Sequence, residues 1–339
     1  MNQKIALITG ITGMVGSHLA EYLINNTDWK IVGLIRWRSS LENISTLINF
    51  ANSSNRVDFI YGDLTDPTSI YNALENQNFD YVFHLAAQSF PKTSFSSPLE
   101  TYNVNILGTS TILETLKTTS PKAIIHVCAS SEVFGRVPKE KTPIKEDCSF
   151  HPASPYAISK VGTDLIGRFY AEAYGLKVLT TRMFTHTGPR RGDVFAESSF
   201  AKQIALAEAG FQEPIIRVGN LDSLRTIADV RDAVRAYFLL VTVNPIAGEY
   251  YNIGGTHTVT VRGILEHLIS ISSISSELDF VVDENRLRPI DADLQLPSTE
   301  KFFSHTGWKP EISFEKTMED LLNYWREKVS KYGNAFLIR

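Results

Sequence analysis

Near its start the chain reads Ile5-Ala6-Leu7-Ile8-Thr9-Gly10-Ile11-Thr12-Gly13-Met14-Val15-Gly16, an apolar run that leads through a glycine-rich turn into a helical pattern. The apolar run at 5–9 predicts a buried strand, and residues 14–25 predict a helix. Glycines at such a turn let the backbone approach a pyrophosphate, and the N-terminus of the helix attracts its charge. The stretch therefore predicts the first strand–turn–helix unit of a dinucleotide-binding fold, although a tight turn without a ligand would use the same glycines. The cofactor-binding candidates here are Gly10, Thr12, Gly13, Met14, Val15 and Gly16.

Strand-like runs continue to alternate with helical patterns through the first half of the chain. The further predicted strands lie at 30–35, 57–61, 81–85, 123–129 and 178–183. The predicted helices lie at 67–74, 98–118 and 154–174. Such alternation is typical of parallel strands joined by crossover helices, so we predict an α/β fold with a Rossmann-type doubly wound parallel sheet.

The pattern becomes less regular after residue 183. Helical patterns at 200–209, 230–241 and 314–328, with a strand pattern at 250–253, predict a smaller α/β C-terminal lobe. We expect residues 1–184 to form the cofactor-binding domain, with 227–256 returning to it. Residues 185–226 and 257–339 are expected to form the substrate-binding lobe.

The composition excludes several classes of protein. The 339 residues carry a net charge of -4, so no basic field draws the chain to nucleic acid or to a membrane surface. Only Cys128 and Cys148 are present, which is too few for a disulfide framework and fits a reducing compartment. No apolar run is long enough to span a bilayer. We therefore expect a cytoplasmic protein without a nucleic-acid or membrane partner.

The end of the second predicted strand indicates which dinucleotide is bound. An acidic residue there would bind an unmodified ribose, but this chain reads Arg36-Trp37-Arg38-Ser39-Ser40. Two guanidiniums and two hydroxyls suit a 2′-phosphate, which favours NADP over NAD, although a solvated basic loop is the simpler alternative. We assign Arg36, Arg38 and Ser39 to this phosphate. The remaining cofactor candidates are Asp63, Leu64, Leu85, Ala86 and Ala87.

Two short motifs carry the predicted chemistry, Ser130-Ser131-Glu132 and Tyr156-Ala157-Ile158-Ser159-Lys160. Tyr156 and Lys160 share a helix face because they are spaced i, i+4, and an ammonium near a phenol favours the phenolate. Tyr156 is then a general base for a sugar hydroxyl, with the Ser130 hydroxyl on the same oxygen. Lys160 could also bond the nicotinamide ribose. Glu132 is either a surface carboxylate or a second base, which would remove the C5 proton of the sugar after C4 has been oxidised to a ketone.

With these motifs the chain resembles the extended short-chain dehydrogenase/reductases over nearly its whole length. Within them it is most similar to GDP-mannose 4,6-dehydratases, through residues 6–13, the Arg36–Ser40 loop, Pro189-Arg190-Arg191-Gly192 and Gly219-Asn220-Leu221. The resemblance implies that Ser130, Glu132, Tyr156 and Lys160 form the catalytic set and that Arg225 and Arg288 lie near the GDP phosphates. It also implies bound NADP, a GDP-sugar substrate, a homodimer or homotetramer, and a product that serves surface polysaccharide synthesis.

The chain departs from the family pattern near the sugar, where Thr185-His186-Thr187 replaces Asn-His-Glu. The full stretch from Arg182 to Lys202, together with residues 286–293, resembles the branch that dehydrates GDP-D-glycero-α-D-manno-heptose, so either this heptose or mannose is the expected sugar. A GDP-4-keto-6-deoxy-sugar reductase and a non-catalytic NADP-sensing scaffold are the alternatives. The related reductases can also carry a glutamate at the position of Glu132, so the Arg36–Ser40 and Pro189–Gly192 loops favour the dehydratase. The substrate-binding candidates are Ser89, Thr185, His186, Arg190, Arg191, Asn220, Arg225 and Arg288.

Overall fold

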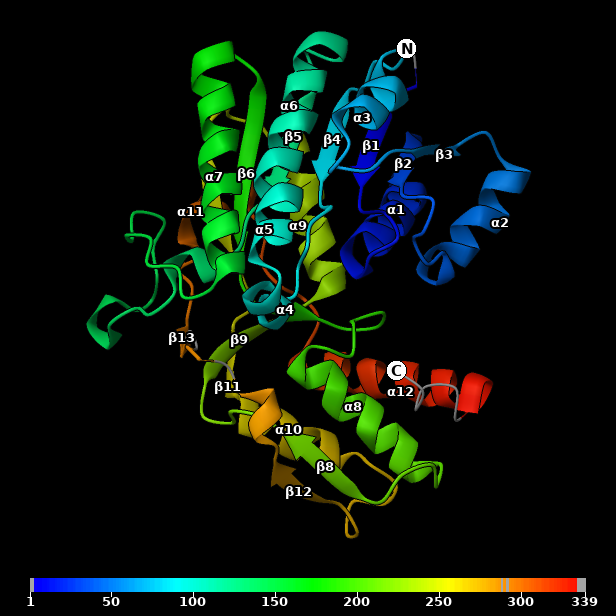
Figure 1. Cartoon of the computed structure of the whole chain (residues 1–339), viewed down its shortest axis with the longest axis vertical. Helices are drawn as coiled ribbons and strands as arrows, with labels where there is room; N and C mark the ends of the chain where they lie inside the picture. Colours follow the sequence, from blue (N-terminus) through cyan, green and yellow to red (C-terminus); the bar gives the residue numbers. More distant parts are fainter. Residues whose placement is uncertain (1–2, 288, 291–292, 334–339) are drawn as a thin grey trace.

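The large domain is built around a seven-stranded parallel sheet (Figure 1). The computed structural model describes residues 3–287, 289–290 and 293–333. In spatial order the strands are β10 (Tyr250–Ile253), β6 (Lys177–Met183), β5 (Ile124–Cys128), β4 (Tyr81–His84), β1 (Ile5–Thr9), β2 (Lys30–Ile35) and β3 (Val57–Tyr61). From β1 the strands β2 and β3 follow toward one edge of the sheet, and β4, β5 and β6 follow toward the other. This reversal of strand order between β1 and β4 confirms the doubly wound α/β fold.

Helices cover both faces of this sheet because its strands are apolar on both sides. Ala6 and Ile8 of β1 point toward the helices α1 (Met14–Asn26) and α9 (Val230–Thr242). Leu7, between them, points to the opposite face and packs with α3 (Pro67–Leu74), α6 (Gly108–Thr119) and α7 (Pro155–Tyr174). The shorter elements of this domain are α2 (Ser45–Ser53), α4 (Pro91–Ser96) and α5 (Pro98–Tyr102).

The predicted helix at 98–118 is interrupted. After α5 the turns widen into a π-helical stretch, Asn103–Leu107, before α6 begins. At its centre the Asn105 amide donates to the Gln88 carbonyl at 2.9 Å and to the Ser159 hydroxyl at 2.8 Å. Such wide turns are frequent at functional sites, and here the turn fastens the segment after β4 to α7.

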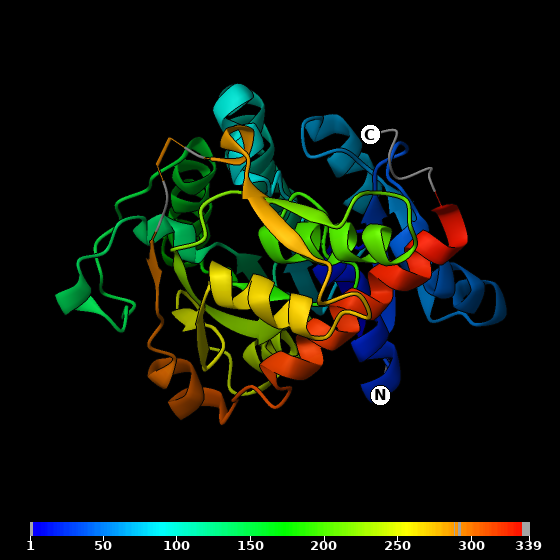
Figure 2. The same cartoon turned by 90° about the horizontal axis from the view of Figure 1, so that it is seen from below.

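The smaller lobe combines short strands with three helices that pack side by side, α8 (Ala196–Glu208), α10 (Val261–Ser270) and α12 (Phe314–Tyr332) (Figure 2). One sheet pairs β9 (Leu224–Asp229) with β11 (His257–Thr260), β13 (Leu294–Gln295) and β7 (His186–Thr187). A second pairs β8 (Ile215–Val218) with β12 (Asp279–Val282). The helix predicted at 200–209 begins four residues earlier, after Phe195.

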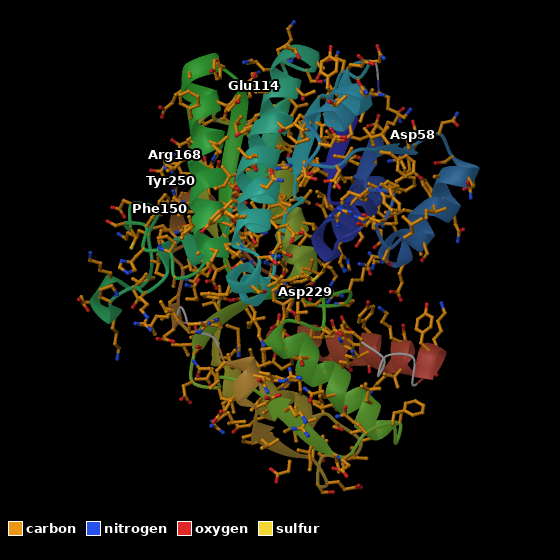
Figure 3. All side chains as sticks on the ribbon, in the orientation of Figure 1. Asp58, Glu114, Phe150, Arg168, Asp229 and Tyr250 are labelled. Atoms are coloured by element: carbon orange, nitrogen blue, oxygen red, sulfur yellow. The ribbon has the colours of Figure 1, made fainter. Side chains whose placement is uncertain are left out.

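The chain crosses between the lobes more than once. Strand β10 pairs with β6 in the large sheet, and α9 packs on α1. Asp229, at the junction in Figure 3, caps α9 and accepts a hydrogen bond from Thr317 of α12 at 2.9 Å. The helix α11 (Glu300–Thr306) returns to the large sheet beside β10. Across residues 3–287, 289–290 and 293–333 no helix has the length and apolar character needed to cross a membrane.

Candidate active site

The glycine turn after β1 forms a cradle that side chains could not share. Gly10 has a φ of 73°, and a Cβ there would lie 2.8 Å from the Ala86 nitrogen. A Cβ on Gly16 would lie 2.3 Å from the Gly10 carbonyl oxygen. The first helix begins after Gly13 without a side-chain cap, which leaves its first amides available to an anion. The turn and residues 85–87 after β4 therefore meet at the carboxyl edge of the sheet, as expected for a dinucleotide site.

The other cofactor candidates lie in two kinds of surroundings, a charged cluster at the end of β2 and the hydrophobic core. Arg38 forms an ion pair with Asp63 at 3.3 Å beside the end of β2. Burial alone would raise the pKa of the Asp63 carboxyl, but hydrogen bonds from Thr65 and the charges of Arg36 and Arg38 outweigh it and lower the pKa. Leu64 instead packs in the core below α6. The structure thus places two guanidiniums and a carboxylate together at this edge.

Three of the predicted catalytic side chains meet where β5 ends and α7 begins. Tyr156 and Lys160 are both buried, with 8% and 6% of their surface exposed. The Lys160 ammonium donates to the Cys128 carbonyl at 2.7 Å and lies 6.0 Å from the centre of the Tyr156 ring. The Ser130 hydroxyl is hydrogen-bonded to the Tyr156 phenol and also accepts from the Glu132 amide at 3.2 Å.

The electrostatics of Tyr156 depend on its neighbours. Burial raises the pKa of the phenol, and the negative charge of Glu132 adds to this effect. The Ser130 hydrogen bond and the positive charge of Arg191 lower the pKa. Burial also lowers the pKa of Lys160. A base at this position thus needs further positive charge nearby to ionise near neutral pH.

Glu132 lies in a short turn, Ser131–Phe134, that follows β5 directly, and its charge acts on the Tyr156 phenol. The carboxylate is half-buried, so it is neither a core residue nor a fully solvated one. Ser130, which caps this turn, therefore fixes both the phenol and the start of the segment that carries the carboxylate.

A buried arginine, which the sequence reasoning missed, anchors the excursion at 136–153 between Glu132 and Tyr156. Arg182 of β6 is 1% exposed, pairs with Asp164 at 2.7 Å and donates to the Glu146 carbonyl at 2.7 Å. Its guanidinium lies 4.7 Å from the Phe150 ring and 4.4 Å from that of Tyr250. Both rings lie beside α7 in Figure 3. An arginine inside a predicted strand of the large sheet was the signal for this cluster.

The two arginines after Pro189 separate. Arg190 pairs with Glu21 of α1 at 2.6 Å, whereas Arg191 pairs with Glu197 of α8 at 3.1 Å. The Arg191 guanidinium also lies 3.3 Å from the centre of the Phe195 ring. Burial and the charge of Arg191 lower the pKa of His186 to about 4, so this imidazole is neutral near pH 7.

The remaining substrate candidates are spread over both lobes. The side-chain oxygen of Asn220 accepts from the Asp222 amide at 3.0 Å, and Arg225 donates to the Leu224 carbonyl at 3.1 Å. The Thr185 carbonyl accepts from Ala228 at 3.0 Å, and Ser89 is exposed after β4. Arg288 lies outside the described residues.

Comparisons with known proteins agree on one family. The family model for GDP-mannose 4,6 dehydratase matches residues 7–321. The chain is 31% identical to a GDP-6-deoxy-D-mannose reductase of Pseudomonas aeruginosa, covering 97% of this chain and 99% of the reductase. It is also 31% identical to a GDP-mannose 4,6-dehydratase of Yersinia enterocolitica, covering 94% and 93%. The structure of RMD from Pseudomonas aeruginosa complexed with NADPH superposes with a TM-score of 0.81 at 29% identity, covering 96% of this chain and 100% of that one.

Proposed function

This chain belongs to the GDP-mannose 4,6-dehydratase family, and from that premise we propose that it is an NADP-dependent GDP-sugar 4,6-dehydratase. The substrate would be a manno-configured GDP-sugar, either GDP-D-glycero-α-D-manno-heptose or GDP-mannose, and the product its 4-keto-6-deoxy form. The observation that carries the proposal is the position of Glu132. The charge of this carboxylate acts on Tyr156, whereas oxidation of the sugar alone would need only Ser130, Tyr156 and Lys160.

The glycine cradle fits the cofactor, because Cβ atoms at Gly10 or Gly16 would collide with backbone. We assign the pyrophosphate to this turn and the 2′-phosphate to Arg36, Arg38 and Ser39. When bound, NADP would supply reversible hydride transfer, so that oxidation at C4 of the sugar is matched by reduction at C6.

The chain's own residues would move the protons. Tyr156, as phenolate, removes the proton of the 4-hydroxyl while the Ser130 hydroxyl holds the same oxygen. The C5 proton becomes acidic once C4 is a ketone, and Glu132 removes it. The same proton then assists departure of the C6 hydroxyl as water, and the proton that Tyr156 took from the 4-hydroxyl replaces the one lost from C5. Oxidation at C4 is balanced by reduction at C6, so the reaction as a whole is redox neutral and releases one water per sugar.

The second lobe would hold the nucleotide. Arginine binds a pyrophosphate through paired hydrogen bonds, and we assign this role to Arg225 and Arg288. Thr185 is smaller than the asparagine of the family pattern, and a smaller side chain leaves room for a sugar with an additional carbon at C6. A homodimer or homotetramer stays a prediction.

The decisive experiment supplies no external reductant. Purified protein is incubated with GDP-mannose and, separately, with the GDP-heptose, and the products are read by NMR and mass spectrometry. We expect a 4-keto-6-deoxy product from at least one sugar, with the same sugar left unchanged by the Tyr156→Phe variant. The preferred sugar then identifies the substrate.

A reductase is the second candidate, since a GDP-6-deoxy-D-mannose reductase matches this chain over 99% of its own length. The same experiment separates the two. If neither sugar reacts alone, and a GDP-4-keto-6-deoxy sugar is consumed only with added NADPH, the dehydratase proposal is wrong. A protein that binds NADP but turns over none of these substrates would be a sensing scaffold.

A further inference from the structure

Arg190 has a backbone conformation that its side chain disfavours. Its φ is 70°, in the left-handed region, and among the described residues other than glycine only Asn244 shares this sign. Asparagine tolerates the region through local hydrogen bonds, but arginine does not. A residue held there is usually fixed by its surroundings, and such residues cluster at functional sites.

The surroundings of Arg190 belong to the helix that begins at the glycine turn. Its guanidinium donates to Glu21 of α1 at 2.6 Å, and Glu21 also accepts from Thr46 at 3.1 Å. His18, one turn earlier on α1, bonds the Pro189 carbonyl at 3.1 Å. The Nη1 atom of Arg190 is buried with no hydrogen-bond partner among the described residues. The ion pair and the His18 contact thus offset two unfavourable terms in this turn, the backbone strain at Arg190 and the buried donor that lacks a partner.

Because Arg190 adopts the left-handed conformation, the side chains of Arg190 and Arg191 point to different helices, that of Arg190 to α1 and that of Arg191 to α8. Arg191 stacks on Phe195 and pairs with Glu197, which is itself only 6% exposed. The Arg191 carbonyl accepts from Ser198, whose hydroxyl accepts from Trp325 of α12. In this position the positive charge of Arg191 acts on Tyr156.

We propose that Arg190 is a positioning residue, whose ion pair with Glu21 holds the left-handed turn that keeps Arg191 beside Tyr156. The inference rests on the proposed function, because it concerns the base of that reaction. The groups that face the phenol are the Ser130 hydroxyl, the Cys128 thiol, the Tyr237 phenol, the carboxylate of Glu132, and the cations Lys160 and Arg191. Arg191 is therefore one of two cations placed to favour the phenolate.

The test compares three variants by the pH dependence of kcat in the cofactor-loaded enzyme. Glu21→Ala removes the tether while keeping a strong helix former on α1. Arg190→Gly removes the tether but relieves the backbone strain. Glu21→Ala should move the rising limb of the profile to higher pH by roughly one unit, which is about tenfold in kcat below the limb, with KM little changed. Arg190→Gly should move the limb less, because glycine adopts the left-handed conformation without a tether. Arg190→Lys, which can still reach Glu21, should restore most of the wild-type profile.

A readout without turnover separates this inference from the proposed function. The Arg191 amide donates to the Gly188 carbonyl at 3.2 Å, so hydrogen exchange of this amide reports on the turn. Exchange should be faster by about tenfold or more in Glu21→Ala, less affected in Arg190→Gly, and unchanged in the control Glu319→Ala, whose carboxylate pairs with Lys316 on α12. An unchanged profile, or unchanged exchange at Arg191, in Glu21→Ala overturns the inference. Absence of turnover in the wild type counts against the proposed function alone, and exchange then decides whether the tether exists.

Discussion

The Lys160 ammonium donates a hydrogen bond to the Cys128 carbonyl at 2.7 Å, and this contact joins the first turns of α7 to the end of β5. The same strand end leads, two residues later, to Ser130. Lys160 thus fixes the distance between the helix that carries the phenol and the strand that carries the hydroxyl. Its charge also remains within 6.0 Å of the Tyr156 ring centre.

Lys160→Met should lower kcat by about a hundredfold or more, because it removes a cation beside the base and leaves the Cys128 carbonyl without its donor. Binding of the GDP-sugar should change little, since the lysine does not face the nucleotide lobe. Initial rates and calorimetric titration measure the two effects. A variant with wild-type kcat near neutral pH would remove Lys160 from the mechanism.

Glu132→Gln separates oxidation from loss of water. The amide can still accept a hydrogen bond but cannot remove the C5 proton, so the sugar should be oxidised at C4 and then stop. Reduced nicotinamide should accumulate and be visible by its absorbance, while mass spectrometry finds no dehydrated product. Normal dehydration by this variant would show that Glu132 is not the second base.

Gly16→Ala should weaken NADPH binding by about tenfold or more, because its Cβ would lie 2.3 Å from the Gly10 carbonyl oxygen and push the turn apart. The matched control is Gly175→Ala, where φ is 69° and no atom lies within 4 Å of the added carbon. The control should cost only about 1 kcal/mol of stability and leave binding unchanged. Fluorescence titration with NADPH and thermal unfolding distinguish the two variants.

Breaking the buried pair between Arg182 and Asp164 should destabilise the protein strongly. Arg182→Met leaves the Asp164 carboxylate, none of whose surface is exposed, with the longer ion pair to Arg168 at 3.4 Å in place of the one at 2.7 Å. The expected loss is about 3–5 kcal/mol in the free energy of unfolding. Lys4→Met removes an exposed pair with Asp80 and should cost less than about 1 kcal/mol. Urea unfolding compares them, and equal losses would contradict the assignment of Arg182 as the anchor of the 136–153 excursion.

Glu208 makes the smaller lobe sensitive to acid. Burial alone would raise the pKa of its carboxyl, but hydrogen bonds from Arg326, Ser272 and the Ser273 amide outweigh it and lower the pKa to about 2. A carboxyl with a lowered pKa stabilises the fold above its ordinary value of 4.5 and loses that contribution as the pH falls toward about 2.

Glu208→Gln should therefore be less stable than the wild type at neutral pH, and the difference should shrink below about pH 4.5. Denaturant unfolding at a series of pH values measures it. Glu319→Gln, whose carboxylate is more than half exposed, should show almost no pH-dependent difference. A constant difference across the acid range for Glu208→Gln would contradict this account.

Local patterns predicted most of the large sheet, because apolar runs and 3.6-residue periodicity are properties of the chain itself. The i, i+4 spacing of Tyr156 and Lys160 likewise needs only a helix. The wide turn at Asn103–Leu107 was not predictable, since its hydrophobic pattern matches that of the continuous helix expected over 98–118. It forms because the Asn105 side chain finds partners on segments distant in the sequence.

The arginines of the site were also only partly predictable from the sequence, because their partners come from distant segments. Their type and position predicted anion binding, but the structure pairs Arg190 and Arg191 with carboxylates on two different helices. Their divergence depends on the sign of one φ angle, which neighbours on α1 decide. Arg182 was missed for a related reason, because its partners come from α7 and from the excursion at 136–153.

The return of β10 to the edge of the large sheet also sets an order of events during synthesis. Strand β6 is translated about seventy residues before Tyr250–Ile253 (its partner), and most of the smaller lobe's first half emerges in between. Until then β6 presents an unpaired edge to solvent or to a neighbouring nascent chain. Translation that ends between Met183 and Tyr250 would therefore produce a fragment prone to edge-to-edge association. The two lobes also cannot be separated by cutting the chain at a single position, because β10 follows part of the smaller lobe in the sequence.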